Sequence, residues 1–269
     1  MLRVVALLAL VACSSDAPSP VEPGAPPPPV EPAPPPRRRV RLLVNTDTTL
    51  YDMNPDTLAL TELGRFKFPP GEDPKMTDIA LDRSGRLWGV SFAAFFQIDP
   101  RTLAVTRLGP TPPDAMINSL AVISSAATGD REKPDLLVAA GYQTSTVYSV
   151  DMAKGSLTPI GDLGGPQAAG DITWGPGVGP VITLRQTFGD DVLAKLEPRT
   201  LRAIPIGNSI GFAHVLGLAP LEHSLLGVTE QGEVIEIDLA TGVGRLRDHH
   251  PLVFYGAAIG WADVTASTP

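Results

Sequence analysis

Residues that could carry out chemistry are sparse in this sequence of 269 residues. None of the four histidines belongs to an HExxH zinc pattern, and none is spaced from a serine and an acid as in known hydrolase motifs. The single cysteine, Cys13, lies near the N-terminus, so the body of the chain can form neither a disulfide bond nor a cysteine-based metal site. The sequence therefore predicts no catalytic residue, no bound metal and no cofactor. The histidines are His214, His223, His249 and His250.

Three residues in loops are the strongest candidates for contacting a ligand. Tyr142 lies in the segment GYQTST, and Arg185 opens the segment RQTFGDD; both segments carry polar groups near one face of the expected fold. His214 comes shortly before an expected inner strand. Binding residues are commonly found in loops that a rigid scaffold holds in place. A single histidine in a loop is more often exposed or hydrogen-bonded than catalytic, so we expect His214 to contact a ligand rather than to catalyse a reaction.

Two aspartates, Asp78 and Asp171, are weaker candidates because they occupy equivalent positions in two copies of a repeat. The other three copies carry Ser119, Gly217 and Ala258 at that position. A metal site of the calcium type needs several carboxylates or amides around one ion, and two acidic positions in five do not supply them. The alternative is that each carboxylate accepts a backbone hydrogen bond at the start of a blade. We favour this structural interpretation.

The elements that position these residues are predicted from a stretch that recurs five times. Its clearest copy, FFQIDPRTLAVTRLG at 95–109, alternates apolar and polar residues up to an acidic position, turns, and continues with a second strand-like segment. Alternation with a period of two predicts half-buried strands, and Asp-Pro suits a β-turn, so each copy is expected to form a β-hairpin. The shared position carries Asn54, Asp99, Asp151, Glu197 and Asp238.

A second pair of strands is expected before each hairpin. The segment MTDIALDRSGRLWGVS at 76–91 contains two apolar runs joined around Ser84-Gly85, and comparable pairs precede the later copies. The shared positions lie 45, 52, 46 and 41 residues apart, and four short strands at such a period are typical of propeller blades. A β-sandwich also contains many short strands, but it would not repeat one motif in register. The longest repeat contains a polar insertion at 124–134, which we interpret as a tolerated loop rather than a binding element.

The C-terminal segment is expected to complete the first blade. The first copy has a strand and a hairpin but lacks a leading strand, whereas Ala258-Ile259-Gly260-Trp261 aligns with the inner strand Asp171-Ile172-Thr173-Trp174. Joining both ends of the chain in one blade removes the open sheet edge. The predicted fold is thus all-β: a five-bladed β-propeller of four-stranded blades, closed by the C-terminal strand. Trp88, Trp174 and Trp261 are expected to pack between blades rather than to stack on sugars.

The recurrent pattern DIALDRSGRLWGV…FQIDPRTLAVTRLG resembles the repeats of bacterial periplasmic propellers, such as the lactonase-like and quinoprotein-like groups. The likeness covers residues 41–267 and is carried by the texture of the repeats, which binding proteins, enzymes and scaffolds share. It therefore implies a fold and leaves the activity open.

The N-terminus carries a different signal. In MLRVVALLALVAC, Arg3 precedes an apolar run at 4–11 that is too short to span a bilayer and is typical of an export signal. Leu10-Val11-Ala12-Cys13 resembles the lipobox of bacterial lipoproteins. The resemblance implies cleavage before Cys13, acylation of Cys13, for example with palmitate, and retention at the cell envelope. Ser14 after the cysteine implies the outer membrane. The alternative is a secretory signal with a chance cysteine.

The segment that follows is dominated by proline. Such a sequence cannot form a helix or a sheet ladder and favours extended polyproline II. At about 3.1 Å per residue it would reach on the order of 80 Å, so we expect a spacer, with a proline-motif ligand as the alternative. The predicted organisation is a signal peptide at 1–12, the lipidated cysteine and spacer at 13–39, and the propeller domain at 40–269.

Charge narrows the range of partners. The formal net charge is −8 and the isoelectric point is about 5.0, which argues against a nucleic-acid-binding surface. We expect a monomer that meets the membrane through the lipid on Cys13 and has an envelope protein or polymer as a possible partner. The leading hypothesis is an anchored binding or scaffolding module without catalysis. The alternative is an extracytoplasmic hydrolase or lyase with its site at the mouth of the propeller channel.

Overall fold

The structure is a computed structural model, and it describes residues 38–72, 75–124 and 135–263. The chain divides into two compact units, 1–35 and 36–269, and the described residues all belong to the second. The signal peptide, Cys13 and most of the predicted spacer lie outside the described residues, as does the greater part of the insertion at 124–134. Among the residues described, no helix has the length and apolar character needed to cross a bilayer.

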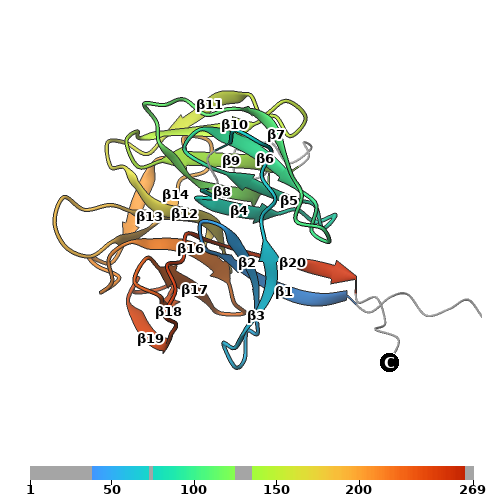
Figure 1. Cartoon of the computed structure of the whole chain (residues 1–269). Helices are drawn as coiled ribbons and strands as arrows, with labels where there is room; N and C mark the ends of the chain where they lie inside the picture. Colours follow the sequence, from blue (N-terminus) through green and yellow to red (C-terminus); the bar gives the residue numbers. More distant parts are fainter. Residues whose placement is uncertain (1–37, 73–74, 125–134, 264–269) are drawn as a thin grey trace, which may run out of the picture. The chain divides into compact units, whose positions relative to one another are not determined.

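The described residues form twenty strands in five antiparallel sheets of four (Figure 1). From the inside outwards, the first blade contains β20 (Gly256–Asp263), β1 (Arg38–Asn45), β2 (Thr49–Met53) and β3 (Leu60–Arg65). The second contains β4 (Asp78–Leu81), β5 (Leu87–Val90), β6 (Ala94–Ile98) and β7 (Val105–Pro110). The third contains β8 (Ile117–Ile123), β9 (Leu136–Gly141), β10 (Thr146–Val150) and β11 (Leu157–Asp162). The fourth contains β12 (Ala168–Gly175), β13 (Gly179–Leu184), β14 (Val192–Leu196) and β15 (Ala203–Ile206). The fifth contains β16 (Val215–Pro220), β17 (Ser224–Thr229), β18 (Glu233–Asp238) and β19 (Gly244–His249).

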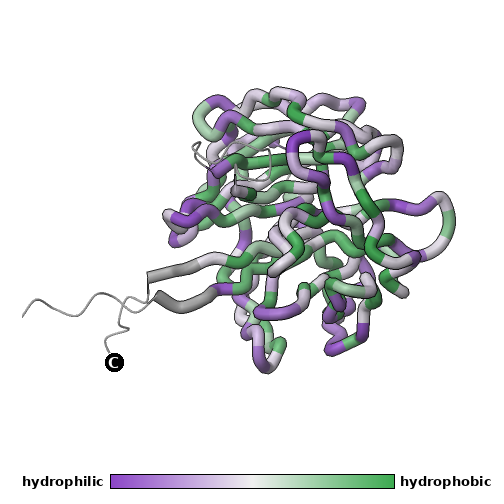
Figure 2. Tube along the Cα trace, turned by 180° about the vertical axis from the view of Figure 1, so that it is seen from behind, coloured by the Kyte–Doolittle hydropathy of each residue, from purple (hydrophilic) through white to green (hydrophobic). Residues whose placement is uncertain are grey.

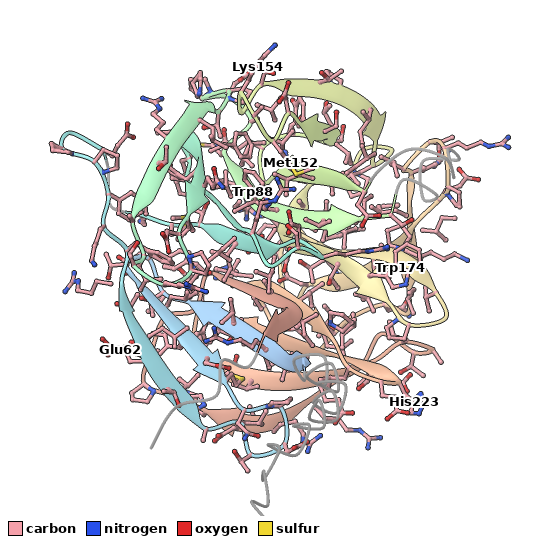
Figure 3. All side chains as sticks on the ribbon, turned by 90° about the vertical axis from the view of Figure 1, so that its right-hand side faces the viewer. Glu62, Trp88, Met152, Lys154, Trp174 and His223 are labelled. Atoms are coloured by element: carbon pink, nitrogen blue, oxygen red, sulfur yellow. The ribbon has the colours of Figure 1, made fainter. Side chains whose placement is uncertain are left out.

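The sheets are arranged as a ring in chain order. The first strand of each sheet contacts its counterpart in the next, so that β4, β8, β12, β16 and β20 surround a common axis (Figure 3). The predicted five-bladed β-propeller is confirmed. Ring closure is confirmed as well, because β20 pairs with β1 over eight residues, from Arg38 opposite Asp263 to Asn45 opposite Gly256.

The acidic or amide residue shared by the five hairpins acts within its own turn. The Oδ1 atom of Asp99 accepts hydrogen bonds from the backbone N–H groups of Arg101 and Thr102, and the same pattern is present at Asn54, Asp151 and Asp238. At Glu197 the longer side chain instead accepts a bond from the Thr200 hydroxyl. The repeated residue is therefore part of the hairpin.

A residue with positive φ follows four positions later in every hairpin. Two copies place Gly155 and Gly242 there, as the sequence suggests, but the other three place leucine, with φ between 57° and 59°. This left-handed conformation costs a leucine roughly 1–2 kcal/mol. Each leucine is at least nine-tenths buried and packs into a core between blades, which offsets that cost. They are Leu58, Leu103 and Leu201.

Five apolar cores lie between neighbouring blades, and the hydrophilic residues concentrate in turns and loops (Figure 2). Trp88 is 2% exposed and packs with residues of β8 and β9, as predicted for a tryptophan between blades. Trp174 departs from that prediction, since it is 40% exposed. Its position at the end of β12 places it beside a cavity rather than in a core. The side chain of Trp261 is not among those that the structure describes.

Candidate functional site

Two cavities lie on the axis of the ring, one at each end of the inner strands. The upper cavity, of about 230 Å³, is lined where these strands begin, by residues such as Thr77, Asn118 and Leu216. The lower cavity, of about 700 Å³, is lined along their second halves, from Ile79, Leu120 and Leu218 onward. The two share no lining residue.

The residues between the cavities are the buried Asp78, Ser119 and Asp171, each at most 1% exposed. Asp78 accepts a hydrogen bond of 2.6 Å from the backbone N–H of Leu120 on β8, and Asp171 accepts one of 2.7 Å from Leu218 on β16. Each carboxylate thus joins its own blade to the next. This arrangement supports the structural interpretation of both aspartates, since neither lines a cavity.

The two carboxyl groups also lie close enough for the charge of Asp171 to act on Asp78, and Oδ1 of Asp171 is buried without a hydrogen-bond partner among the described residues. Burial and then the negative charge of Asp171 raise the pKa of Asp78 well above its usual range. Burial likewise raises the pKa of Asp171, against the opposing effect of the hydrogen bond from the Leu218 N–H group. Both carboxyl groups therefore stay protonated to a higher pH than exposed aspartates do.

The upper cavity is formed by the loops that enter the inner strands and by those that follow the second strand of each blade. Tyr142, Arg185 and Glu230 are the first residues after β9, β13 and β17. Because the blades repeat, equivalent loop positions from successive blades converge on the axis. The cavity is lined by Thr77, Phe92, Asn118, Tyr142, Ala169, Arg185, Asp191, His214, Leu216, Glu230 and Tyr255.

Aromatic rings form part of this wall. Tyr142 packs edge-to-face on Phe92, with ring centroids 5.7 Å apart, and the guanidinium of Arg185 lies 6.0 Å from the centroid of the Tyr142 ring. Tyr255 has the ammonium group of Lys75 at 5.9 Å from its centroid. Cations stacked on tyrosine faces keep their N–H groups available for a ligand.

A histidine and a glutamate lie on two loops of the fifth blade. Nδ1 of His214 and Oε2 of Glu230 are 2.5 Å apart, which leaves Nε2 of the ring as the second polar atom of the histidine. His214 has φ of 53°, and Met116, which also directly precedes an inner strand, has φ of 48°, so this conformation recurs where the chain enters a blade.

Asp191 is 3% exposed, and its Oδ2 atom accepts a hydrogen bond from the Val215 backbone N–H at 2.7 Å. Burial raises the pKa of Asp191 to about 6, against the opposing effect of that hydrogen bond and of His214. A carboxyl group that titrates near pH 6 at the wall of a cavity is a functional-site feature.

Asn118 supplies the least satisfied polar atom of the upper cavity. Its side-chain N–H group donates to the Ala169 carbonyl at 2.9 Å, and its Oδ1 atom is buried without a hydrogen-bond partner. A buried acceptor left unpaired costs about 1–3 kcal/mol. A ligand or water with an O–H or N–H group would recover that energy.

The structure brings together three of the sequence-predicted candidates: Tyr142, Arg185 and His214 all line the upper cavity. Asp78 and Asp171 lie below it. Sequence reasoning did not single out Asp191, although it lies in the segment that begins at Arg185. Glu230 could have been found as the counterpart of Arg185 in the next blade. Asn118 lies one residue before Ser119, the counterpart of Asp78 in the third blade, and nothing in the sequence distinguishes it as a binding residue.

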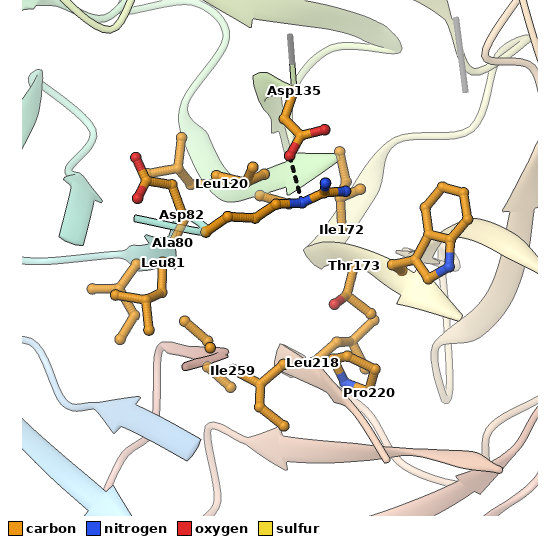
Figure 4. A pocket seen from close by; sticks show the side chains of 18 of the residues that line it. Ala80, Leu81, Asp82, Leu120, Asp135, Ile172, Thr173, Leu218, Pro220 and Ile259 are labelled. Carbon is orange, nitrogen blue, oxygen red and sulfur yellow. Dashed lines mark ion pairs between the residues drawn. The ribbon is translucent and has the colours of Figure 1, made fainter. Parts of the chain in front are cut away.

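The lower cavity has apolar and polar walls, which include Leu81, Thr173, Pro220 and Asp135 (Figure 4). Each inner strand carries a branched residue at one register position, but four of the five are at most 1% exposed and pack in the cores between blades: Ile79, Leu120, Ile172 and Leu218. At the mouth, Arg83 and Asp135 form an ion pair of 2.8 Å between the second and third blades. Within the described part of the chain, no group of three or more histidine, cysteine or acidic residues is arranged to hold a metal ion.

Comparison with solved structures supports the fold. One chain of a nidogen/laminin complex has a TM-score of 0.50 and 12% sequence identity, and the match covers 82% of this chain and 98% of that one. A protein of unknown function from Bacteroides caccae has a TM-score of 0.46 and 14% identity over the same shares of the two chains. The first of these likenesses, at 12% identity, shows the fold alone. No protein-family model and no curated protein sequence matches the chain.

Proposed function

We propose that this protein is an envelope-anchored binding module whose propeller holds a small polyhydroxylated ligand, the size of one sugar unit, in the upper cavity. The observation that carries the proposal is the convergence of Tyr142, Arg185, His214 and Asn118 on one cavity. These residues come from the third, fourth and fifth blades, so the site exists only in the assembled ring.

The size and chemistry of the cavity support a sugar. Its volume of about 230 Å³ equals that of about eight water molecules at ~30 Å³ each, which suits a single ring better than an extended ligand. Asn118, Asp191 and Glu230 offer acceptors, whereas Arg185 and the tyrosine hydroxyls offer donors. Hydroxyl groups can use both kinds of partner.

The anchor is the second part of the proposal. Acylation of Cys13 would hold the propeller at the envelope, and several acyl chains at about 0.8 kcal/mol per buried methylene group make a durable anchor. The ligand would then be the end group of an envelope polymer or a free sugar. Cys13→Ser should release the protein from the membrane fraction. Retention of the variant at the membrane would contradict the anchor but not the binding site.

Ligand-observed NMR with a panel of neutral sugars, sugar acids and amino sugars tests the binding site. Arg185→Ala should weaken the best ligand at least tenfold, because the guanidinium lies at the cavity wall and is exposed. Arg101→Ala, an exposed arginine in the hairpin turn of the second blade, is the matched control and should leave the affinity unchanged. Absence of binding across the panel, or equal effects of the two variants, would refute the proposal.

A second function, acid–base catalysis at the same mouth, is favoured by Asp191, whose pKa of about 6 lies near the pH at which a general base operates. In this case the bound sugar derivative would be converted by hydrolysis or elimination. The NMR samples that show binding should then show product, and Asp191→Asn should stop product formation while a weaker binding remains detectable. Stable substrate over days would exclude this function for the sugars tested.

A further inference from the structure

The buried end of the upper cavity differs in chemistry from its mouth. We infer that the cavity selects an amino sugar, whose primary ammonium group enters first and contacts Asn118 and Asp191. This inference rests on the proposed function, because it names the class of sugar that the same site takes. The lining residues differ in depth: Thr77, Asn118, Ala169 and Asp191 are buried, whereas Arg185 and His214 are exposed.

The floor of the cavity, where the inner strands begin, offers a side-chain acceptor and no free side-chain donor among the described residues. The amide of Asn118 is fixed by the bond that its N–H group donates to the Ala169 carbonyl, since the reversed amide would place oxygen against oxygen. Its Oδ1 atom is therefore the acceptor that is left unpaired within the described part of the chain. The hydroxyl of Thr77 already donates to the carbonyls of Val90 and Ile117, at 3.1 and 3.2 Å. A ligand must thus present an N–H or O–H group to this floor.

The charge at the buried end is negative. Asp191 is the one charged side chain among the buried residues that are described as lining the cavity. Its Oδ2 atom accepts the Val215 N–H, which leaves Oδ1 as the second acceptor of the group. Burial raises the pKa of Asp191 to about 6, so the ionised carboxylate is held in the fold at a cost. A cation beside a buried carboxylate offsets this cost, which a neutral hydroxyl does only in part.

The mouth supplies the donors. The guanidinium of Arg185 is exposed and lies 6.0 Å from the centroid of the Tyr142 ring, where it can donate to the hydroxyl groups of a sugar. Burial, the largest effect on the pKa of Asp191, outweighs the opposing effects of His214 and Arg185, so these groups do not compensate the carboxylate. An ammonium group has three N–H donors and no acceptor, and its hydrogen bonds to a carboxylate are about twice as strong as those between neutral groups. The ligand is therefore oriented with its ammonium inward and its hydroxyls outward.

Matched pairs of sugars test the inference. Glucosamine and glucose, galactosamine and galactose, and mannosamine and mannose differ only in the group on the second carbon. Ligand-observed NMR titrations at pH 7 should show at least tenfold tighter binding of the amino sugar in the pair that binds best. Equal affinities within every pair would overturn the inference and leave the sugar site of the proposed function intact. Absence of binding by all six sugars would overturn both.

Two variants identify the group that selects the ammonium. Asp191→Asn keeps an acceptor for the Val215 N–H and removes the charge, so the preference for the amino sugar should fall below threefold while the neutral sugar still binds. Asp190→Asn makes the same change of charge one residue away, at a half-buried side chain that accepts a bond from the Ser209 hydroxyl and does not line the cavity. This matched control should keep the preference. Equal loss of preference in both variants would show that the overall charge selects the ammonium, and would overturn the inference.

Discussion

Two neighbouring carboxyl groups, those of Asp78 and Asp171, are buried at the centre of the ring. Asp78 and Asp171 each accept a backbone N–H from the neighbouring blade, so their oxygen atoms are needed as acceptors. Their charges, in contrast, are unfavourable because both groups are shielded from water. The aspartates therefore contribute shape and hydrogen bonds, and their ionisation works against the fold.

This arrangement predicts how stability changes with pH. The folded-state pKa values of both groups are raised, so their contribution is fully present below the usual aspartate range and is lost as pH rises through the raised values. Each retained proton contributes a slope of up to about 1.4 kcal/mol per pH unit. Asp171→Asn keeps an acceptor for Leu218 and can donate to Asp78, so we expect a smaller loss of stability with rising pH. Urea unfolding between pH 5 and 9 measures this.

Asp99→Asn is the control for that experiment. Asp99 lies exposed in a hairpin turn, and hydrogen bonds from the N–H groups of Arg101 and Thr102 lower its pKa. Burial, which raises the pKa values of Asp78 and Asp171, therefore does not raise that of Asp99. A pH profile of Asp171→Asn that matched those of Asp99→Asn and the unmodified protein would show that ionisation of the two buried carboxyl groups does not destabilise the fold.

Replacing Asp191 by asparagine should have opposite effects on the stability of the fold and on ligand binding. Its pKa of about 6 means that the carboxylate destabilises the fold as pH rises through that value. Asn in its place retains an acceptor for the Val215 N–H and removes the buried charge. We expect Asp191→Asn to raise the unfolding free energy at pH 7.5 by about 1–2 kcal/mol and to weaken ligand binding. Thermal unfolding at pH 5 and 7.5 measures the first effect, and no gain at pH 7.5 would contradict it.

At the scale of the elements, the hairpin turn of one blade packs against the outer strand of the blade before it. A Cβ atom at Gly109 would lie 2.6 Å from the Lys154 carbonyl oxygen, and one at Gly155 would lie 2.7 Å from the Gly109 nitrogen. The glycine that ends the repeated stretch is therefore required by contact between blades. The sequence shows that a glycine recurs at this position of the repeat. It does not show why, because the contact joins two different copies of the repeat.

This packing predicts that Gly109→Ala destabilises the protein by about 1–3 kcal/mol, since the clash is with backbone that cannot rotate away. Thr106→Ala, three residues earlier on the exposed face of β7, should change the unfolding free energy by less than about 0.5 kcal/mol. Chemical denaturation of both variants measures the difference. Equal stability of the two variants would show that the blades adjust without strain.

The strands and the blade count could be predicted from sequence because both depend on local alternation and on a motif repeated in register. The upper cavity could be predicted only in part. Tyr142, Arg185 and His214 were recognisable as polar residues in loops where the copies differ, and ring geometry then brings such loops together. The role of Asn118 and the lower cavity depend on which way each inner strand faces, which five short copies do not reveal.

For the whole molecule, closure of the ring is expected to make unfolding cooperative. The pairing of β20 with β1 joins the two ends of the domain, and β20 also supplies Ile259 to the lower cavity. A chain that ends at Tyr255 should lose a single cooperative unfolding transition, because the first blade lacks its inner strand and leaves two blades unpaired. A chain that ends at Asp263 should keep it. A truncated chain ending at Tyr255 with unchanged unfolding would contradict this dependence on closure.

Mapping where a sugar binds tests the proposed site most directly. Backbone amide shifts of the labelled protein should be recorded during titration with the best ligand from the NMR panel. We expect shifts confined to the upper mouth, at Tyr142, Arg185, Asp191 and His214 and their loop neighbours, with none at the lower end of the inner strands. Shifts elsewhere, or no response to any sugar of the panel, would contradict the assignment of the upper cavity as the binding site.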